Sequence, residues 1–190
     1  MADVSTILPL GATAPDFALP EVTDGTTVSL ADVADADALV VMFLCRHCPY
    51  VQHVQDEVAR IADEYAPRGV SFVGIAPNDP DTYPDDAPDS LAEQKRQVGW
   101  GFPYLFDATQ EVAKAYGAAC TPDTFVFDRD LRLVYRGQLD ETRPRQGQQP
   151  TGRDLRAALD AVLAGDPVPE EQYPSVGCSI KWRPGNQPAA

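Results

Sequence analysis

Residues 38–44 read ALVVMFL, and this unbroken apolar run most constrains what the chain can fold into. A strand with one face exposed to solvent alternates apolar and polar side chains. A run without polar positions therefore indicates a strand that is buried on both faces. A second such run, VSFVGIA, covers residues 70–76. Between the two, apolar residues recur at helical spacing from Val51 to Tyr65, and Pro67 with Gly69 ends the pattern. The order strand, helix, strand predicts an α/β sheet protein.

The rest of the chain continues this alternation. Residues 78–90, NDPDTYPDDAPDS, are rich in Pro and Asp and predict a long exposed loop. The later patterns predict two more helices, over 91–98 and 110–116, and an antiparallel hairpin formed by 124–127 and 133–136 around the turn DRD.

The end of the chain predicts a last helix and a tail. Thr151 with Asp154 resembles a capping box that begins this helix, and Gly165 ends it. At 190 residues the chain is long enough for one well-buried core. We therefore expect one domain over 1–166 and a proline-containing tail over 167–190, packed on that domain.

Charge narrows the choice of partners. The chain has 15 basic and 29 acidic side chains, a formal net charge of −14, so neither nucleic acid nor an anionic membrane is expected as a partner. Asp outnumbers Glu by 21 to 8 and Arg outnumbers Lys by 12 to 3, a bias that resembles halophilic proteins, although ordinary acidic cytosolic proteins are the alternative. No basic segment followed by an apolar run opens the sequence, and no run of about 18 apolar residues occurs, so we expect a cytoplasmic location.

The stretch FLCRHCPYV places Cys45 and Cys48 where the first strand meets its helix. In a reducing cytosol a C-x-x-C pair is typical of redox catalysis or metal binding rather than of a permanent disulfide. Unpaired N–H groups at a helix start favour a thiolate, and Arg46 and His47 add positive charge. Pro49 suits the first helical turn, where no intrahelical N–H partner is needed. We therefore place Cys48 at the helix cap and predict one thiol more acidic than free cysteine.

Several segments together resemble the peroxiredoxin-like members of the thioredoxin superfamily, the AhpC/TSA or redoxin-domain proteins, here with a C-x-x-C motif. They lie within residues 12–183 and read FLCRHCPYV, NDPDTYPDD, FPYLFDATQEVAKAYGAACTPDTFVFD, LVYRGQLDETRP and GCSIKW. The resemblance implies a thioredoxin-like α/β fold, with a central mixed sheet flanked by helices, an N-terminal extension and a C-terminal tail. Likeness to thioredoxin makes Cys45 the attacking sulfur and Cys48 the resolving one, whereas likeness to peroxiredoxins puts the attack at Cys48. We favour Cys45, and the sequence leaves both assignments open.

Thr121 and Pro122 resemble the superfamily's cis-proline site, which lies beside the cysteine pair and leaves the preceding backbone free to pair with an extended substrate; a trans proline opening a strand is the alternative. Pro122 also stands where peroxiredoxins carry the arginine that activates peroxide, and the threonine that they place three residues before the attacking cysteine is absent. These departures argue against efficient peroxide reduction. Residues 38–44 contain no counterpart of the buried carboxylate of thioredoxin, so water, His47 or the substrate has to move the proton.

Two cysteines lie outside the pair. Strand alternation turns Cys120 away from Thr121, and we expect a buried structural thiol there. Cys178 follows DPVPEEQYP, a proline-rich connector that allows the tail to return over the site. Cys178 is therefore a possible third redox thiol, and the alternative is a tail anchored simply by Ile180 and Trp182.

A metal-binding protein is the competing interpretation from another class. Four residues near the motif offer thiolate and imidazole ligands that suit copper(I) or zinc: Cys45, His47, Cys48 and His53. His53 shares a helical face with charged residues, which favours a solvated polar side chain. We therefore assign no metal site.

The sequence thus predicts an enzyme, a thiol-disulfide oxidoreductase that exchanges disulfides through Cys45 and Cys48. The supporting residues are Arg46, His47, Pro49, Thr121 and Pro122. We expect protein or small-molecule disulfides and thiols as partners, together with an unidentified electron donor, and no cofactor. Peroxide reduction is the alternative among enzymes, and copper or zinc binding is the alternative outside them.

Overall fold

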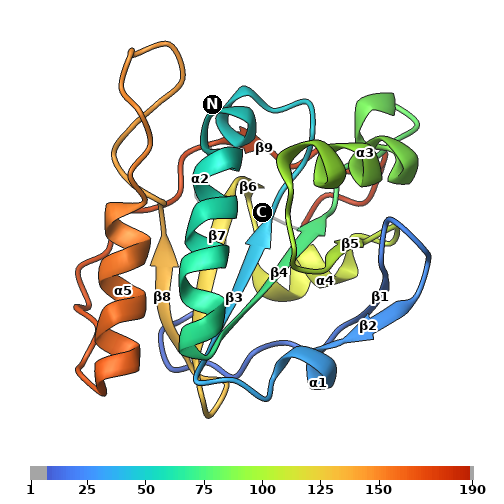
Figure 1. Cartoon of the computed structure of the whole chain (residues 1–190). Coiled ribbons are helices and arrows are strands. Elements are labelled where there is room, and N and C mark those ends of the chain that lie inside the picture. Colours follow the sequence, from blue (N-terminus) through green and yellow to red (C-terminus); the bar gives the residue numbers. More distant parts are fainter. Residues whose placement is uncertain (1–7, 189–190) are drawn as a thin grey trace.

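The computed structural model describes residues 8–188, and its centre is a five-stranded mixed sheet in the order β5-β4-β3-β7-β8 (Figure 1). The two continuous apolar runs form neighbouring parallel strands, β3 (Ala38–Phe43) and β4 (Val70–Ala76). β5 (Tyr104–Phe106) is parallel to β4, while β7 (Asp123–Asp128) and β8 (Leu133–Gly137) are antiparallel. The predicted mixed sheet and its antiparallel hairpin are confirmed.

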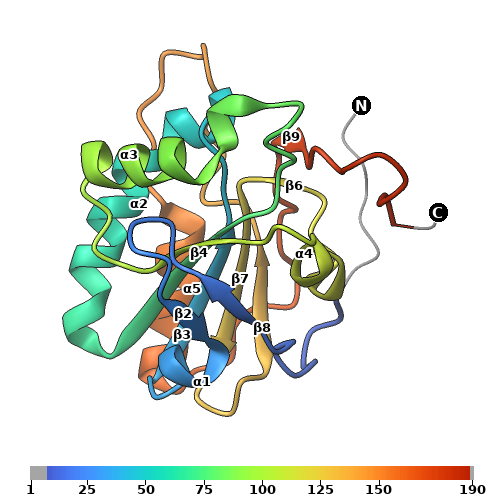
Figure 2. The ribbon, with the colours of Figure 1, turned by 90° about the vertical axis from the view of Figure 1, so that its right-hand side faces the viewer.

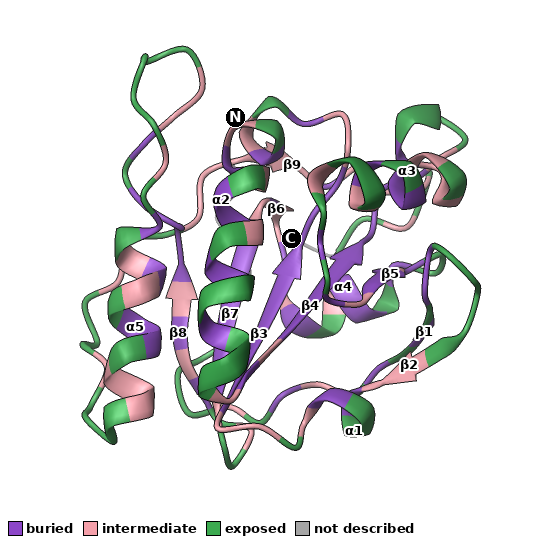
Figure 3. Ribbon diagram, in the orientation of Figure 1, coloured by how far each residue is buried: buried purple, intermediate pink, exposed green. Residues whose placement is uncertain are grey.

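Strand β3 supplies both hydrophobic cores because its side chains alternate between the two faces of the sheet. Val40 and Met42 belong to one core, whereas Leu39, Val41 and Phe43 belong to the other. All six residues of β3 are buried, and Figure 3 shows the central strands buried along almost their whole length. This double burial explains why the run contains no polar position.

Helices cover both faces of the sheet (Figure 2). The core on one face takes side chains from α2 (Pro49–Tyr65), α3 (Pro88–Val98) and α5 (Arg153–Ala164). The other core takes them from α1 (Leu30–Val33) and α4 (Glu111–Tyr116). The 3₁₀ turns are Ala66–Arg68 and Pro84–Asp86. Among the described residues no helix combines the length and apolarity that a membrane crossing requires.

Short strands complete the fold, and the sequence pattern did not reveal them. β1 (Ala18–Pro20) pairs with β2 (Thr27–Ser29), and β6 (Cys120–Thr121) pairs with β9 (Cys178–Ser179), in both cases antiparallel. Elements of two or three residues are too short to show alternation. The β6–β9 pair decides what surrounds the cysteine motif, as described below.

The exposed-loop prediction for residues 78–90 is wrong in part. A 3₁₀ turn and the start of α3 lie in this stretch, and Asn78, Asp79 and Asp86 are buried. Their polar side chains are tolerated there because each has hydrogen-bond partners inside the protein.

The predicted capping box of the last helix is also wrong. Its cap residue is Gly152, with a left-handed φ of 62° that favours glycine, and no side chain of the helix caps it. Instead the carboxylate of Asp140 accepts the backbone N–H groups of Thr151 and Gly152, both at 2.7 Å. Asp154 accepts a hydrogen bond from the amide of Gln138.

After α5 the chain turns back across the carboxyl end of the sheet. Gln138 N–H donates to the carbonyl of Tyr173, and Ile180 N–H donates to the carbonyl of Ala119, at 2.9 and 3.0 Å. Ile180 is buried in the core shared with α1 and α4. The tail is thus held along its length by backbone hydrogen bonds and by an apolar anchor.

Candidate active site

The C-x-x-C pair lies where β3 ends and α2 begins, as the sequence predicts. Cys48 has the extended backbone of a helix cap, with φ −73° and ψ 123°, and Pro49 occupies the first turn of α2. Cys45 follows β3 by two residues. Both cysteines are free thiols and both are 0% exposed.

Thr121 contacts the sulfur atoms of both Cys45 and Cys48. Its hydroxyl lies 3.1 Å from Sγ of Cys45, and its carbonyl lies 3.2 Å from Sγ of Cys48. The Thr121–Pro122 peptide bond is cis, as the resemblance implies. The short strand β6 therefore positions a hydroxyl and a carbonyl within reach of the two thiols.

The pKa values of the two thiols are shifted in opposite directions. The pKa of Cys48 is lowered to about 5, chiefly by a hydrogen-bond interaction with the Cys45 thiol, which outweighs burial; Cys178 and the N–H of Val51 act in the same direction. The pKa of Cys45 is raised, first by sharing its proton with Cys48, then by burial and by the negative charge of Asp86. One thiol is therefore much more acidic than free cysteine, and it is Cys48.

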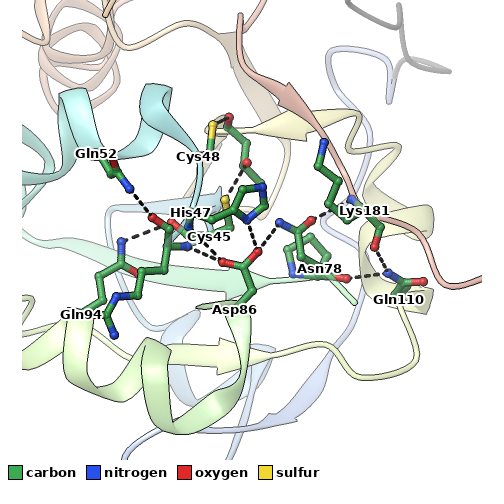
Figure 4. Close-up of polar contacts among 12 residues, drawn as sticks. Cys45, His47, Cys48, Gln52, Asn78, Asp86, Gln94, Gln110 and Lys181 are labelled. Atoms are coloured by element: carbon green, nitrogen blue, oxygen red, sulfur yellow. Dashed lines mark hydrogen bonds and ion pairs between the residues drawn. The ribbon is translucent and has the colours of Figure 1, made fainter. Parts of the chain in front are cut away.

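Asp86 is the functional residue that the sequence analysis missed. Its carboxylate is fully buried and accepts hydrogen bonds from the backbone N–H groups of Arg46 and His47, at 2.7 and 3.2 Å. It also lies 2.5 Å from Nδ1 of His47 and accepts from the amide of Asn78 at 2.8 Å (Figure 4). The site therefore has a buried carboxylate, supplied by the segment after β4 instead of by β3.

The same network reaches the tail. Asn78 accepts the backbone N–H of Lys181 at 2.9 Å, and the amide of Gln110 donates to the carbonyl of Lys181 at 3.0 Å (Figure 4). Asn78 comes soon after β4, the parallel neighbour of β3, and carboxyl ends of parallel strands meet at one edge of a sheet. This rule about parallel strands could have pointed, from the sequence alone, to the stretch that contains Asn78 and Asp86.

The structure changes the roles expected for Arg46 and His47. The guanidinium of Arg46 donates to the carbonyl and hydroxyl of Ser90, so it contacts α3 and neither sulfur. The ring of His47 stacks on Tyr83 at 4.8 Å and bonds to Asp86. His47 is thus fixed beside the pair by a carboxylate and an aromatic ring.

Cys178 lies at the site, and Cys120 is turned from it. In the β6–β9 pair Thr121 is opposite Cys178, and Cys178 interacts with the sulfur of Cys48 through its thiol and its backbone N–H. Cys120 is half-buried, and its thiol contacts the carbonyl of Pro122 at 3.5 Å. Ile180 is buried and anchors the tail, and a redox role of Cys178 stays a prediction.

The four ligands considered for a metal are not brought together. His53 is half-buried, and its Nε2 lies 3.0 Å from the hydroxyl of Thr142, so the expectation of a solvated side chain is only partly correct. Among residues 8–188, the potential ligands that do gather are Cys45, His47 and Asp86, with donor atoms within 4.8 Å of one another.

Comparison with known proteins identifies the family. The AhpC/TSA family model matches residues 10–136. The Mycobacterium tuberculosis protein named "Putative peroxiredoxin Rv2521" is 30% identical over 142 residues, 68% of this chain and 85% of that protein. The crystal structure of an uncharacterized conserved protein from Geobacillus kaustophilus is 57% identical with a TM-score of 0.92, over 95% of this chain and 96% of that one.

A solved structure of lower sequence identity shares the fold of this chain. The thiol:disulfide interchange protein of the thioredoxin family from Chlorobium tepidum is 22% identical with a TM-score of 0.63, over 80% of this chain and 97% of that one. At this identity the likeness extends to the fold alone. The match over residues 10–136 and the 30% identical relative show that the chain belongs to the AhpC/TSA family, a peroxiredoxin-like family with the thioredoxin-like fold described above.

Proposed function

We propose that the protein is a thiol-disulfide oxidoreductase whose Cys45 and Cys48 cycle between two thiols and a disulfide. The observation that carries this proposal is the pair of free thiols at the start of a helix, both contacted by Thr121, and the opposite pKa shifts of the two sulfurs agree with it. Disulfide exchange needs a thiolate to attack and a second thiol close enough to complete the disulfide. The site supplies both at neutral pH.

The different pKa shifts of Cys48 and Cys45 lead us to assign different roles to their sulfurs. Cys48, whose pKa is lowered to about 5, is the sulfur of the pair that enters exchange, because its thiolate is favoured and it also leaves readily. Cys45 then attacks Cys48, forms the Cys45–Cys48 disulfide and releases the substrate thiol. These are the roles that likeness to peroxiredoxins implies, and they differ from our preference for Cys45 at the sequence level.

The proton of Cys45 has an acceptor in this arrangement. The donor atoms of Cys45, His47 and Asp86 lie within 4.8 Å of one another, and Asp86 holds Nδ1 of His47. A histidine whose ring is held by a carboxylate is oriented to take and return a proton. We assign to this His–Asp pair the proton transfer that accompanies opening and closing of the disulfide.

Replacement of cysteines tests the proposal. The double variant Cys45→Ser, Cys48→Ser should lose reduction of insulin disulfides by dithiothreitol, because it has neither the thiolate nor the resolving thiol. Cys120→Ser is the matched control and should keep most of the activity, since its thiol contacts a backbone carbonyl. Full activity in the double variant would reject the proposal.

Peroxide reduction is the second candidate, favoured by the family match and the Mycobacterium tuberculosis relative. The contacts of the site argue against it, because the guanidinium of Arg46 bonds to Ser90 and that of Arg136 bonds to Asp123 and the Gly117 carbonyl. A parallel assay with hydrogen peroxide decides. Turnover with peroxide that exceeds turnover with insulin would reverse the order of the two candidates.

The cluster Cys45, His47 and Asp86 supports a third candidate, zinc binding, because thiolate, imidazole and carboxylate are all zinc ligands. Zinc would compete with the hydrogen bond between His47 and Asp86. Calorimetric titration of the reduced protein with zinc, compared with His47→Ala, tests this candidate. Zinc binding that is weakened by the substitution would establish it, and binding unaffected by it would remove it.

A further inference from the structure

The tail closes the active site. Strand β9 pairs with β6, whose Thr121 contacts both cysteines, and neither Cys45 nor Cys48 has exposed surface. The fit is tight at Gly177, where an added Cβ would lie 2.1 Å from the carbonyl oxygen of Thr121. Only glycine allows this approach, so the segment is shaped to lie against β6. An outside molecule cannot touch either sulfur of the pair while the tail is in place.

Cys178 is the sulfur that connects the closed site with solvent. It is half-buried, whereas the pair is fully buried. Its register opposite Thr121 brings it to the residue whose carbonyl contacts Sγ of Cys48. Both Cys45 and Cys178 lower the pKa of Cys48 through hydrogen bonds. The three cysteines therefore lie close together, and Cys178 is the least buried of them.

We propose that Cys178 is a third catalytic sulfur, at which low-molecular-weight thiols and disulfides exchange with the buried pair. This inference rests on the proposed function and adds the class of substrate. The shallow position of Cys178 and the occupied edge of β6 suit a small thiol, whereas a protein strand would first have to displace β9.

Reduction of the pair then takes three exchange steps. The thiolate of Cys178 attacks Sγ of Cys48, the Cys45–Cys48 bond breaks, and Cys45 leaves with the electron pair and takes a proton from His47. An external thiolate then attacks Sγ of Cys178 and Cys48 leaves as thiolate. A second external thiolate attacks the external sulfur, which frees Cys178. Two small thiols are oxidised to one disulfide, and the Cys45–Cys48 disulfide is reduced to two thiols.

The pKa shifts favour the second step, whereas in the first step Cys45, whose pKa is raised, leaves as it takes a proton. The pKa of Cys178 is raised to about 12, first by burial and then by Cys48. The second cause disappears when Cys48 is part of a disulfide, so Cys178 ionises more readily when the pair is oxidised. Cys48, the most acidic of the three, is the group that leaves in the second step, and a leaving thiol of low pKa leaves faster.

The first test follows the reduction of the oxidised protein by glutathione, with acid quenching and alkylation at successive times. Cys178→Ser keeps the backbone pairing and removes the sulfur, and it should slow reduction on the order of tenfold or more. Cys120→Ser, on the strand paired with β9, is the control and should match the wild type. A Cys178→Ser protein reduced as fast as the wild type, or faster, would overturn the relay and leave the tail as a cover only.

The second test traps the relay bond. In a Cys45→Ser, Cys120→Ser protein, one equivalent of DTNB should label Cys178, and Cys48 should then displace the label and form a Cys48–Cys178 disulfide that peptide mapping detects. A stable adduct without this bond would contradict the relay. The trapped bond tests the relay by itself, whereas the proposed function fails separately if Cys48→Ser leaves exchange with glutathione unchanged.

Discussion

At the scale of single residues, Asp86 determines how charge is distributed over the site. A carboxylate without exposed surface is stable here because it accepts N–H groups from Arg46 and His47, the amide of Asn78, and a bond to Nδ1 of His47. Its negative charge adds to the raised pKa of Cys45, after proton sharing with Cys48 and burial. The acidic sulfur is Cys48, at the helix start, whose pKa is lowered chiefly by its hydrogen bond with Cys45.

The titration of Cys48 is a direct prediction. In the reduced protein the ultraviolet absorbance of one thiolate should appear with a midpoint near pH 5, so the thiolate persists above this pH and is lost as the pH falls through it. Cys45→Ala should move the midpoint upward because it removes the hydrogen-bond donor that is the largest cause of the shift. Cys120→Ser should not. A midpoint at about 8.5, the value of a free thiol, would contradict the geometry.

A second prediction concerns the carboxylate itself. Asp86→Asn removes the charge that raises the pKa of Cys45, so a second thiolate should appear at lower pH than in the wild type. The neighbouring Asp85 is exposed, and Asp85→Asn is the matched control that should leave the titration unchanged. Identical titrations of Cys45 in Asp86→Asn and in the wild type would show that the carboxylate charge does not act on this sulfur.

At the scale of elements, Asp140 organises the turn that leads into α5. It is buried and accepts N–H groups from Thr142, Thr151 and Gly152, together with the Thr142 hydroxyl. Burial raises its pKa, but these hydrogen bonds outweigh burial and the pKa is lowered. A residue from the preceding strand end thus replaces the capping box that the sequence suggests.

Urea unfolding can separate the two capping schemes. Asp140→Ala should lose about 3 kcal/mol of unfolding free energy at neutral pH, because buried N–H groups lose their acceptor. Thr151→Ala should change it by about 0.5 kcal/mol or less, since the side chain is exposed. The extra unfolding free energy of the wild type relative to Asp140→Ala should be lost as the pH falls through the lowered pKa of Asp140. Equal losses in the two variants would restore the capping box.

The length of an element and the regularity of its sequence pattern determined whether that element could be predicted from the sequence. The central strands, α2 and the hairpin repeat a period over five or more residues, so the sequence predicts them. The pair β6–β9 joins residues far apart in sequence through two-residue strands, which leave no periodic trace. Asp86 could not be distinguished from its aspartate neighbours, because burial is a property of the folded chain. The sequence thus predicted the pair and missed the carboxylate beside it.

At the scale of the whole molecule, the net charge leads to a prediction about stability. A net charge of −14 makes the folded chain repel itself, and salt shortens the reach of that repulsion. The screening length falls from about 10 Å at 0.1 M salt to about 3 Å at 1 M. The Asp and Arg bias leads us to predict a protein suited to high salt.

Thermal unfolding in potassium chloride tests this prediction. The midpoint should rise between 0.1 M and 1 M salt as the repulsion is screened. Sucrose that leaves the ionic strength unchanged is the control and separates screening from general solute effects. A midpoint that stays constant or falls in potassium chloride would argue for an ordinary acidic protein.

The close contact of Gly177 with Thr121 also bears on chemical damage. Thiolates are the form of cysteine that peroxides convert to sulfinic and sulfonic acids, and these products are not recovered by exchange with thiols. Cys48 is a thiolate at neutral pH, yet it has no surface at which an oxidant can collide with it. The covering strand therefore gives the protein a reactive sulfur with a long chemical lifetime, and leaves the more weakly acidic Cys178 to meet oxidants first.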